Sequence, residues 1–271
     1  MADADNTVLG LIGSGNMAGA MVRGWVRADP AIASRLLVTD RGSGRAAALA
    51  DRHGVRHVES NAELVREADV VVLCVKPIDV ERVLREVSEL VTKDKAIASV
   101  AAGVRTATLE TILDVDAPVF RFMPNVGVSV GEGTLAYAPG RFIDTSAERA
   151  VLEQFRLLGE VVPLDERQFD AATALSGSGP AFIGLIVEAF EDAGIVSGLS
   201  YDQARRLILS TISGTAALLT EEELPSAALR RMVTSPGGTA AAGLAEMERR
   251  GVRGAIIDGV TQAMRRAGEL G

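Results

Sequence analysis

The sequence predicts an α/β protein in two parts, a doubly wound parallel sheet followed by an all-helical region. In the first half, short apolar runs alternate with helical patterns, which is typical of a parallel sheet covered on both faces. A glycine-rich turn joins the first run to the first helical pattern. Beyond Pro163 no run reads as a central strand. We therefore expect one domain over residues 1–163 and a second, helical domain over residues 164–271.

Each expected element follows from its apolar pattern. The strands are short and mostly Val, Ile, Leu or Ala, at residues 8–12, 36–39, 55–58, 70–75, 96–100 and 119–123. The helices between them have apolar residues three and four positions apart, at 16–27, 45–53, 61–67, 78–90 and 108–112. The second half has helical patterns separated by Gly, Pro and Ser, at 168–174, 181–193, 201–219, 226–233, 239–249 and 252–269.

Composition narrows the class of protein. The formal net charge of −8 argues against nucleic acid or an anionic membrane surface as a partner. The single cysteine, Cys74, excludes an intramolecular disulfide and favours a reducing compartment. The acidic start of the chain lacks the basic region of a signal peptide, and no apolar run approaches the ~20 residues of a spanning helix. We expect a cytoplasmic protein that acts on a small molecule.

The turn after the first strand has the residues of a dinucleotide-binding turn. Its sequence, GSGNMA, comprises Gly13, Ser14, Gly15, Asn16, Met17 and Ala18. Gly13 allows a tight turn, Gly15 lets the backbone approach a pyrophosphate, and Ala18 lets the helix pack closely on the strand. The start of that helix offers free N–H groups to the phosphates. The flanking strand and helix make this context specific, so we predict a Rossmann domain that binds a nicotinamide dinucleotide.

The end of the second strand does not decide between NADH and NADPH. An acidic residue here holds the ribose 2′-hydroxyl of NAD, whereas a nearby arginine accommodates the 2′-phosphate of NADP. The segment Asp40, Arg41, Gly42, Ser43 offers both devices, and Arg45 is a third candidate or a solvated surface charge. We name NADPH as the expected cofactor and leave NADH open.

Polar residues also follow later strands, where ligands bind at the edge of a doubly wound sheet. Lys76 ends the segment CVKP, in which Cys74, Val75 and Pro77 are its neighbours. It either reaches a cofactor or substrate or simply ends the strand in solvent. The segments AAG at 101–103 and RFMPN at 121–125 occupy the same place after their strands.

Two further segments make a family resemblance specific. LSGSGPAF at 175–182 and TSPGGT at 234–239 each start a helix with hydroxyls and free N–H groups, which suits a carboxylate. Together with the turn, CVKP and the segments after the fifth and sixth strands, they resemble pyrroline-5-carboxylate reductases over the whole chain. The resemblance implies hydride transfer from NAD(P)H to a cyclic imine, the last step of proline biosynthesis. It also implies a helical domain that forms homodimers or larger assemblies, with the active site between the domains.

The resemblance also assigns residues. The cofactor residues it implies, with the turn itself, are Gly13, Ser14, Gly15, Asn16, Met17, Ala18, Asp40, Arg41, Gly42, Asn61, Cys74, Val75, Lys76, Pro77, Ala101, Ala102 and Gly103. The residues it implies near the substrate are Glu166, Ser235, Gly237, Gly238 and Thr239, to which we add Lys76. We expect no metal ion at the site.

One position departs from the family pattern. The family usually has a second hydroxyl residue after the first Thr of its PGGT segment, placed to bond the ring nitrogen, but this chain has Ala240. Thr239 or a water then replaces that hydroxyl, or the substrate is a related cyclic imine. The histidines, His53 and His57, lie far from the motifs, and we expect both at the surface.

Two other functions are consistent with a Rossmann and a helical domain. A β-hydroxyacid dehydrogenase needs a lysine on an interdomain helix, but no lysine follows Lys95. A non-catalytic dinucleotide sensor would have no use for the polar starts of the late helices, above all the segment 235–239. A turnover assay distinguishes a sensor from an enzyme.

Overall fold

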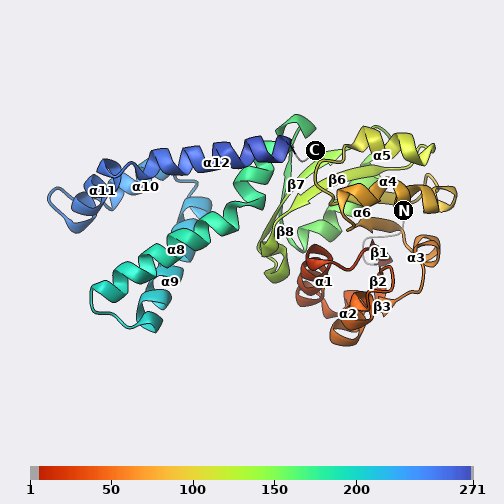
Figure 1. Cartoon of the computed structure of the whole chain (residues 1–271), viewed down its shortest axis with the longest axis horizontal. Helices are drawn as coiled ribbons and strands as arrows, with labels where there is room; N and C mark the ends of the chain where they lie inside the picture. Colours follow the sequence, from red (N-terminus) through yellow and green to blue (C-terminus); the bar gives the residue numbers. More distant parts are fainter. Residues whose placement is uncertain (1–5, 270–271) are drawn as a thin grey trace. The chain divides into compact units, whose positions relative to one another are not determined.

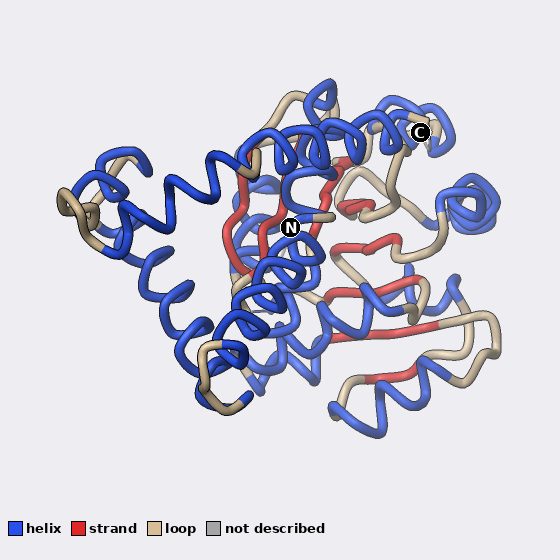
Figure 2. The backbone as a smooth tube through the Cα atoms, turned by 60° about the vertical axis from the view of Figure 1, so that its left-hand side comes forward, coloured by secondary structure: helices blue, strands red, loops and turns tan. Residues whose placement is uncertain are grey.

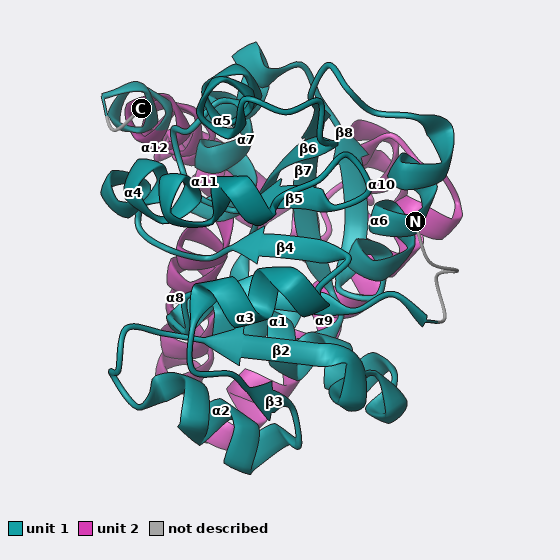
Figure 3. Ribbon diagram, turned by 90° about the vertical axis from the view of Figure 1, so that its right-hand side faces the viewer, with its two compact units in different colours: residues 1–178, 264–271 teal, residues 179–263 magenta. Residues whose placement is uncertain are grey.

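The computed structural model describes residues 6–269, so most of the acidic N-terminal segment considered above lies outside the described residues. The described chain divides into two compact units (Figure 3). Unit 1 comprises the residues up to Ser178 together with those from Met264 onward, and unit 2 is Gly179–Ala263. The expected domain boundary at residue 163 therefore lies before the division between the compact units, which follows Ser178. That residue 163 separates a dinucleotide-binding domain from a dimerisation and substrate domain stays a prediction.

Within the described residues of unit 1, eight strands form one sheet, in the order β3-β2-β1-β4-β5-β6-β7-β8 (Figure 2). The strands are β1 Leu9–Ile12, β2 Leu36–Thr39, β3 Arg56–His57, β4 Val70–Leu73, β5 Ala96–Ser99, β6 Val119–Pro124, β7 Gly133–Pro139 and β8 Gly159–Pro163. The first six follow the order of a Rossmann fold, with the switch in strand order between β1 and β4. This confirms the predicted fold class.

Helices cover both faces of this sheet (Figure 1). They are α1 Asn16–Ala28, α2 Arg45–His53, α3 Asn61–Glu67, α4 Pro77–Val87, α5 Thr106–Leu113 and α6 Thr145–Arg156. One core joins α1, α2 and α6 to the side chains on one face of the strands, such as Leu11 and Val72. A second core joins α3, α4 and α5 to the alternate side chains, such as Ile12 and Val71. The strands read as continuous apolar runs because both faces are buried.

The six strands that the sequence predicts are parallel, but the sheet continues beyond them with an antiparallel pair. β6 and β7 are antiparallel, whereas β8 returns parallel to β7 after α6. A 3₁₀ helix, Val126–Val130, makes the connection between β6 and β7. A parallel pair needs a crossover of a dozen or more residues, so this short connection reverses the chain direction. The sequence prediction missed β7, α6 and β8 because it found no alternation of apolar runs and helices between residues 124 and 163.

Unit 2 is helical, as expected. Its helices are α8 Gly179–Val196, α9 Tyr201–Glu221, α10 Ser226–Met232, α11 Thr239–Arg249 and α12 Val252–Gly268, the last of which continues into unit 1. Much of their apolar surface is exposed in the single chain, including Leu185 at 67% and Ile257 at 58%. Across residues 6–269, no helix is both long enough and apolar enough to cross a membrane.

Candidate functional site

The turn between β1 and α1 has the geometry that its glycines predict. Gly13 has a φ of +101°, and a side chain there would lie 2.9 Å from the backbone carbon of Cys74. Gly15, by contrast, has open space where a side chain would begin. Ala18 is fully buried in the core beneath α1. The turn therefore closes tightly at Gly13 and leaves room at Gly15, as a pyrophosphate requires.

The Ser14 hydroxyl is used within the protein. It donates a hydrogen bond of 3.1 Å to the carbonyl oxygen of Thr39, which also accepts 3.0 Å from the Gly13 N–H. These two bonds fasten the turn to the end of β2. Ser14 thus offers a ligand its backbone more readily than its hydroxyl.

Asp40 organises the loop after β2. One oxygen, Oδ1, accepts from the Ser43 N–H at 2.9 Å, and Oδ2 accepts from the Ser43 hydroxyl at 2.7 Å and the Ala46 N–H at 2.8 Å. Partial burial pushes the Asp40 pKa upward, but these hydrogen bonds outweigh it and hold the pKa below its usual value. The carboxylate is therefore ionised and already engaged by its own loop.

A cleft of about 260 Å³ lies where β1, β2 and β4 end, at the switch in strand order. Many of the predicted cofactor residues line it together: Gly13, Ser14, Gly15, Asp40, Arg41, Asn61, Cys74, Val75 and Lys76. Ligands of open α/β sheets bind at this place. Ser43 and Arg45, which the sequence offers as further candidates in the loop after β2, also line it, whereas Ile12, Asp79, Arg82 and Val83 were not predicted.

The other predicted cofactor residues lie outside this lining: Asn16, Met17, Ala18, Gly42, Pro77, Ala101, Ala102 and Gly103. Ala18 and Ala101 are buried in the cores of unit 1, so their small side chains serve packing. Pro77 is the first residue of α4, where its fixed φ suits a helix start. Gly42 and Gly103 have positive φ and shape their loops. A cofactor role for these positions stays a prediction.

Charged side chains cross the mouth of the cleft. Arg41 reaches from the β2 loop to Asp79 in the first turn of α4, with 3.3 Å between the paired atoms. Arg82 lies 3.4 Å from the same carboxylate. Farther along, Asn61 donates to Glu86 at 3.1 Å. Loop and helix are thereby linked by ion pairs, and no motif in the sequence signals the link between Arg41 and Asp79.

Two residues at the end of β4 differ in character. Lys76 is exposed, lines the cleft and directly precedes α4. Burial raises the pKa of the Cys74 thiol to about 12, so the thiol is neutral at physiological pH. Of the two, Lys76 is the group that brings charge to a ligand.

Glu166 is held inside unit 1. Its Oε1 accepts from the Thr106 N–H at 3.1 Å and from Arg121 at 3.2 Å, and its Oε2 accepts from the Thr106 hydroxyl at 3.0 Å. Arg121 is buried, and its guanidinium lies 4.2 Å from the centre of the Phe169 ring. Glu166 therefore fastens the start of α5 and the middle of β6 to the segment that follows β8.

A π-helix, Thr173–Gly177, overlaps the first three residues of the segment LSGSG at 175–179, and such helices often mark functional positions. Asn125, at the end of β6, donates to the Ser176 carbonyl at 3.3 Å and its hydroxyl at 3.2 Å. The Asn125 Oδ1 accepts from the N–H groups of Gly127 and Thr134, at 3.0 and 3.2 Å. Two sequence segments that had been singled out separately, RFMPN and LSGSG, are thus in direct contact.

In unit 2, the segment 235–239 forms the start of α11. Gly237 has a φ of +71° and Gly238 is the N-cap residue, without a side-chain cap. Ser235 and Thr239 are exposed beside them. The first N–H groups of α11 therefore lack a capping side chain. There is open space beside Gly237, whereas the Gly238 N–H donates to the Ser235 carbonyl at 3.0 Å.

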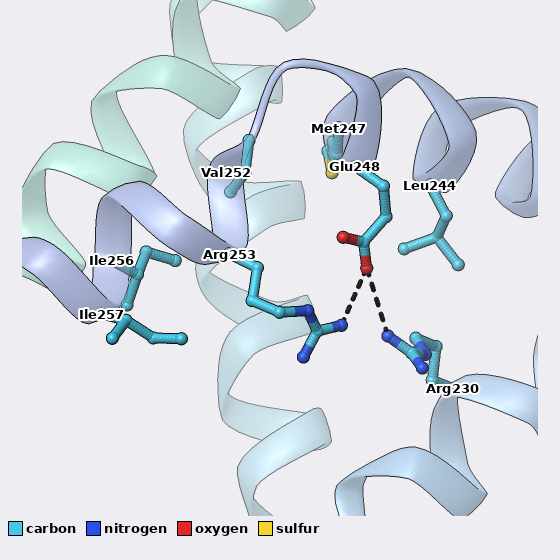
Figure 4. A pocket seen from close by; sticks show the side chains of 8 residues that line it. All are labelled: Arg230, Leu244, Met247, Glu248, Val252, Arg253, Ile256 and Ile257. Carbon is cyan, nitrogen blue, oxygen red and sulfur yellow. Dashed lines mark hydrogen bonds and ion pairs between the residues drawn. The ribbon is translucent and has the colours of Figure 1, made fainter.

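Unit 2 also contains an apolar pocket of about 420 Å³ (Figure 4). Its lining comes from α10, α11 and α12: Arg230, Leu244, Met247, Glu248, Val252, Arg253, Ile256 and Ile257. Glu248 lies 2.8 Å from Arg253 and 3.5 Å from Arg230. A mostly apolar hollow that is open in a single chain suits contact with another apolar surface.

The histidines are not both surface residues, which corrects the expectation. His57 is exposed on β3, but His53 is half-buried at the end of α2. Among the described residues, its Nε2 is buried without a hydrogen-bond partner. Burial, with Arg52 and Arg23 nearby, lowers its pKa. Since α2 is polar on its outer side, the sequence alone did not indicate on which side His53 would lie.

Comparisons of both halves of the chain with known proteins point to the same family. Residues 166–270 match the family model described as pyrroline-5-carboxylate reductase dimerisation. Residues 8–103 match the model described as NADP oxidoreductase, coenzyme F420-dependent. The structure resembles a pyrroline-5-carboxylate reductase of Coxiella burnetii, with a TM-score of 0.88, 34% identity and 98% of both chains covered. That of Plasmodium falciparum, solved with NADP bound, gives 0.86 and 28% over 98% of both chains.

Relatives named pyrroline-5-carboxylate reductase match nearly the full sequence. The protein of Mycobacterium leprae is 39% identical, with 94% of this chain and 93% of its own length covered. That of Methanosarcina acetivorans is 35% identical, with 98% and 99% covered. That of Pseudomonas aeruginosa is 37% identical, with 97% and 96% covered. The chain, with its Rossmann turn, polar cleft and helical second half, belongs to the pyrroline-5-carboxylate reductase family.

Proposed function

We propose that the chain reduces 1-pyrroline-5-carboxylate to L-proline with NADPH, the last step of proline biosynthesis. The observation that carries the proposal is the full-length match to pyrroline-5-carboxylate reductases, which includes both halves of the chain. The cleft at the ends of β1, β2 and β4 supports it, because a dinucleotide binds at this edge of a Rossmann sheet.

The residues of the cleft fit a dinucleotide. The open space at Gly15 and the start of α1 suit the pyrophosphate. Asp40 is engaged by Ser43 and Ala46, whereas Arg41 and Arg45 bring positive charge to the cleft. This balance supports NADPH over NADH, because a 2′-phosphate needs cations rather than a carboxylate.

When bound, the reduced nicotinamide supplies the hydride. The protein binds and orients the reactants, which accounts for much of the rate of such a reaction. We assign the substrate carboxylate to the start of α11, where the open backbone at Gly237, the uncapped first N–H groups of the helix and the Thr239 hydroxyl suit an anion. Ser235 is placed beside it. Lys76 contributes positive charge on the cofactor side.

Glu166 is assigned a positioning part rather than a proton-transfer part. Both of its oxygens accept hydrogen bonds from Thr106 and Arg121, so it holds the segment that precedes LSGSG. Because a protonated imine is already electrophilic, the reaction does not require a carboxylate acid–base pair.

We further propose that the protein works as a homodimer in the cytoplasm. The exposed apolar side chains of α8 and the pocket of α10 to α12 support association through unit 2. The family model for residues 166–270 is named for dimerisation. The single cysteine is consistent with a reducing compartment.

A second candidate substrate is a related cyclic imine of another ring size. Ala240 favours it, because a methyl group stands where the family usually has a hydroxyl. Only the identity of the ring distinguishes this candidate from the first.

The deciding experiment is a steady-state assay of the purified protein in both directions. Pyrroline-5-carboxylate and its six-membered analogue are reduced with NADPH or NADH, and L-proline and L-pipecolate are oxidised with NADP⁺ or NAD⁺. The proposal expects the highest kcat/KM for the five-membered ring with NADPH. A higher value for the six-membered ring supports the second candidate, and no turnover of either would overturn both.

A further inference from the structure

In the dinucleotide cleft, the Asp79 carboxylate pairs with the guanidinium groups of two arginines, Arg41 and Arg82. Its Oδ1 lies 3.3 Å from Arg41 Nη1, and its Oδ2 accepts from Arg41 Nη2 at the same distance. This makes the contact bidentate, the geometry that arginine prefers for a carboxylate or a phosphate. Arg82 is 3.4 Å from Asp79 Oδ1. Asp79 and both arginines line the same cleft as Ser43 and Arg45.

The Arg41 side chain is therefore occupied by the protein before any ligand arrives. Arg41 follows Asp40 at the end of β2, the place where a Rossmann domain distinguishes a 2′-hydroxyl from a 2′-phosphate. Asp79 comes from another element, the first turn of α4, and it is well covered, with 20% of its side chain exposed. Its carboxylate occupies the fork of Arg41 that a phosphate would otherwise fill.

We infer that Asp79 is a specificity-determining residue that lowers the preference for NADPH over NADH by competing with the 2′-phosphate for Arg41. The inference rests on the proposed dinucleotide function of this cleft. When a 2′-phosphate takes the Arg41 fork, Asp79 loses that partner and stays nearby as a like charge. NADH has no 2′-phosphate and experiences neither effect.

The exposure of the Arg41 side chain sets the size of the change in cofactor preference. The Arg41 side chain is 68% exposed, so solvent screens its pairing with Asp79, and an exposed pair of this kind changes an equilibrium by about 5-fold at most. A ligand phosphate can therefore displace Asp79. The carboxylate adjusts the ratio of the two affinities without blocking either cofactor.

The test compares the dissociation constants of NADPH and NADH for the full-length protein and Asp79→Asn, by isothermal titration calorimetry. Asparagine keeps the shape and removes the charge. We expect NADPH to bind about 3- to 5-fold more tightly to Asp79→Asn, with NADH changed less than 2-fold. The gain should shrink as salt rises, because it is electrostatic.

Glu81→Gln is the matched control. Glu81 is on the same helix and pairs with Arg85 at 2.9 Å, but it is outside the cleft lining. Its substitution should leave both dissociation constants unchanged. A second comparison introduces Asp79→Asn into the Arg41→Ala variant. Because the effect acts through Arg41, the gain in NADPH affinity should be smaller there than in the parent protein.

The outcomes separate the inference from the function on which it rests. If the parent protein binds both cofactors and Asp79→Asn leaves their ratio unchanged, the inference is wrong and the proposed function stands. Equal changes for both cofactors, or a full gain that persists with Arg41→Ala, also overturn it. If the parent binds neither cofactor, the proposed function fails as well.

Discussion

The Arg121 guanidinium and the Glu166 carboxylate are joined by a hydrogen bond of 3.2 Å between β6 and the segment that follows β8. Only 7% of the Arg121 side chain and 22% of the Glu166 side chain are exposed. Arg121 also lies over Phe169, and Glu166 also caps Thr106. The pair thus connects three parts of unit 1 at a position where solvent screens little.

Removing the charge of Arg121 should destabilise the protein. We expect Arg121→Met to lower the free energy of unfolding by about 2–3 kcal/mol, because Glu166 then loses a charged hydrogen-bond partner in a covered position. Urea denaturation measures this. Arg167→Met is the control, since the Arg167–Asp165 pair is exposed and solvent screens it, so its loss should lower the free energy of unfolding less. Equal losses in the two variants would contradict the structural importance of Arg121.

Gly15→Val should abolish dinucleotide binding and leave the fold intact. The structure has open space around the Cβ position of Gly15, so a side chain begins there without a clash but occupies the place of the pyrophosphate. Calorimetry with NADPH measures the loss of binding, and circular dichroism measures whether the fold is intact. Gly13→Val is the contrasting variant, which should not fold normally, because its side chain would meet the Cys74 backbone at 2.9 Å. Normal affinity in a folded Gly15→Val protein refutes the Rossmann turn.

Stability should fall at mildly acidic pH through His53. Burial lowers its folded-state pKa below the unfolded value of 6.5, so the unfolded chain takes up the proton first as the pH falls. Above pH 6.5, His53 is neutral in both states and does not reduce the free energy of unfolding. As the pH falls from 6.5 through the lower folded-state pKa, that free energy decreases progressively. His53→Gln should reduce the drop in Tm between pH 7.5 and 5.5, whereas His57→Gln, at an exposed position, should not. Identical pH profiles for parent and His53→Gln would argue against this assignment.

The protein should be a dimer or larger at micromolar concentration. Leu185 in α8 is 67% exposed in the single chain, within a helix that also exposes Ile183 and Phe190. A helix apolar on most sides needs a partner surface. Light scattering should report at least twice the chain mass for the parent and a lower mass for Leu185→Glu, with Glu188→Gln as the control on the same helix. A monomeric parent ends this idea.

The substrate assignment predicts a loss for Thr239→Val. Removing a hydroxyl that bonds a charged ligand should cost about 1–3 kcal/mol, or roughly 5- to 150-fold in affinity. Ala240→Thr should preserve or raise activity on the five-membered imine, since it restores the family pattern. Steady-state kinetics with pyrroline-5-carboxylate and L-proline measure both. If Thr239→Val leaves KM unchanged and Ala240→Thr abolishes turnover, the substrate lies elsewhere, nearer Lys76 and Asn125.

The sequence predicts the order of the elements well where a local signal exists. The ends of α2, α3 and α11 agree with the predicted ranges because a glycine or a capping serine marks at least one end. Residues 126–163 were not predicted, because β7 pairs antiparallel with β6 through the turn that Asn125 stabilises, and β8 pairs with β7 at the edge of the sheet. The turn depends on hydrogen bonds that the Asn125 side chain accepts from Gly127 and Thr134, and the apolar periodicity does not encode them.

Some residues of the candidate site can likewise be recognised from a local sequence signal, and others cannot. The turn residues Gly13 and Gly15 are recognisable because backbone geometry restricts those positions to glycine. Asp79 and the pairing of Arg121 could not be found, because their partners, Arg41 and Glu166, are 38 and 45 residues away in the sequence. An acidic residue in the first turn of a helix has an ordinary explanation in the helix dipole, so nothing in the sequence separates Asp79 from other such residues.

The neutral thiol of Cys74 has a practical consequence for handling and for oxidative conditions. Burial raises the pKa of the Cys74 thiol to about 12, so almost none of it is thiolate at pH 7. Peroxides and alkylating reagents attack the thiolate, so Cys74 in the folded protein should react with them slowly. Loss of the fold would restore ordinary reactivity, which makes the rate of labelling by iodoacetamide a report on local opening at the end of β4.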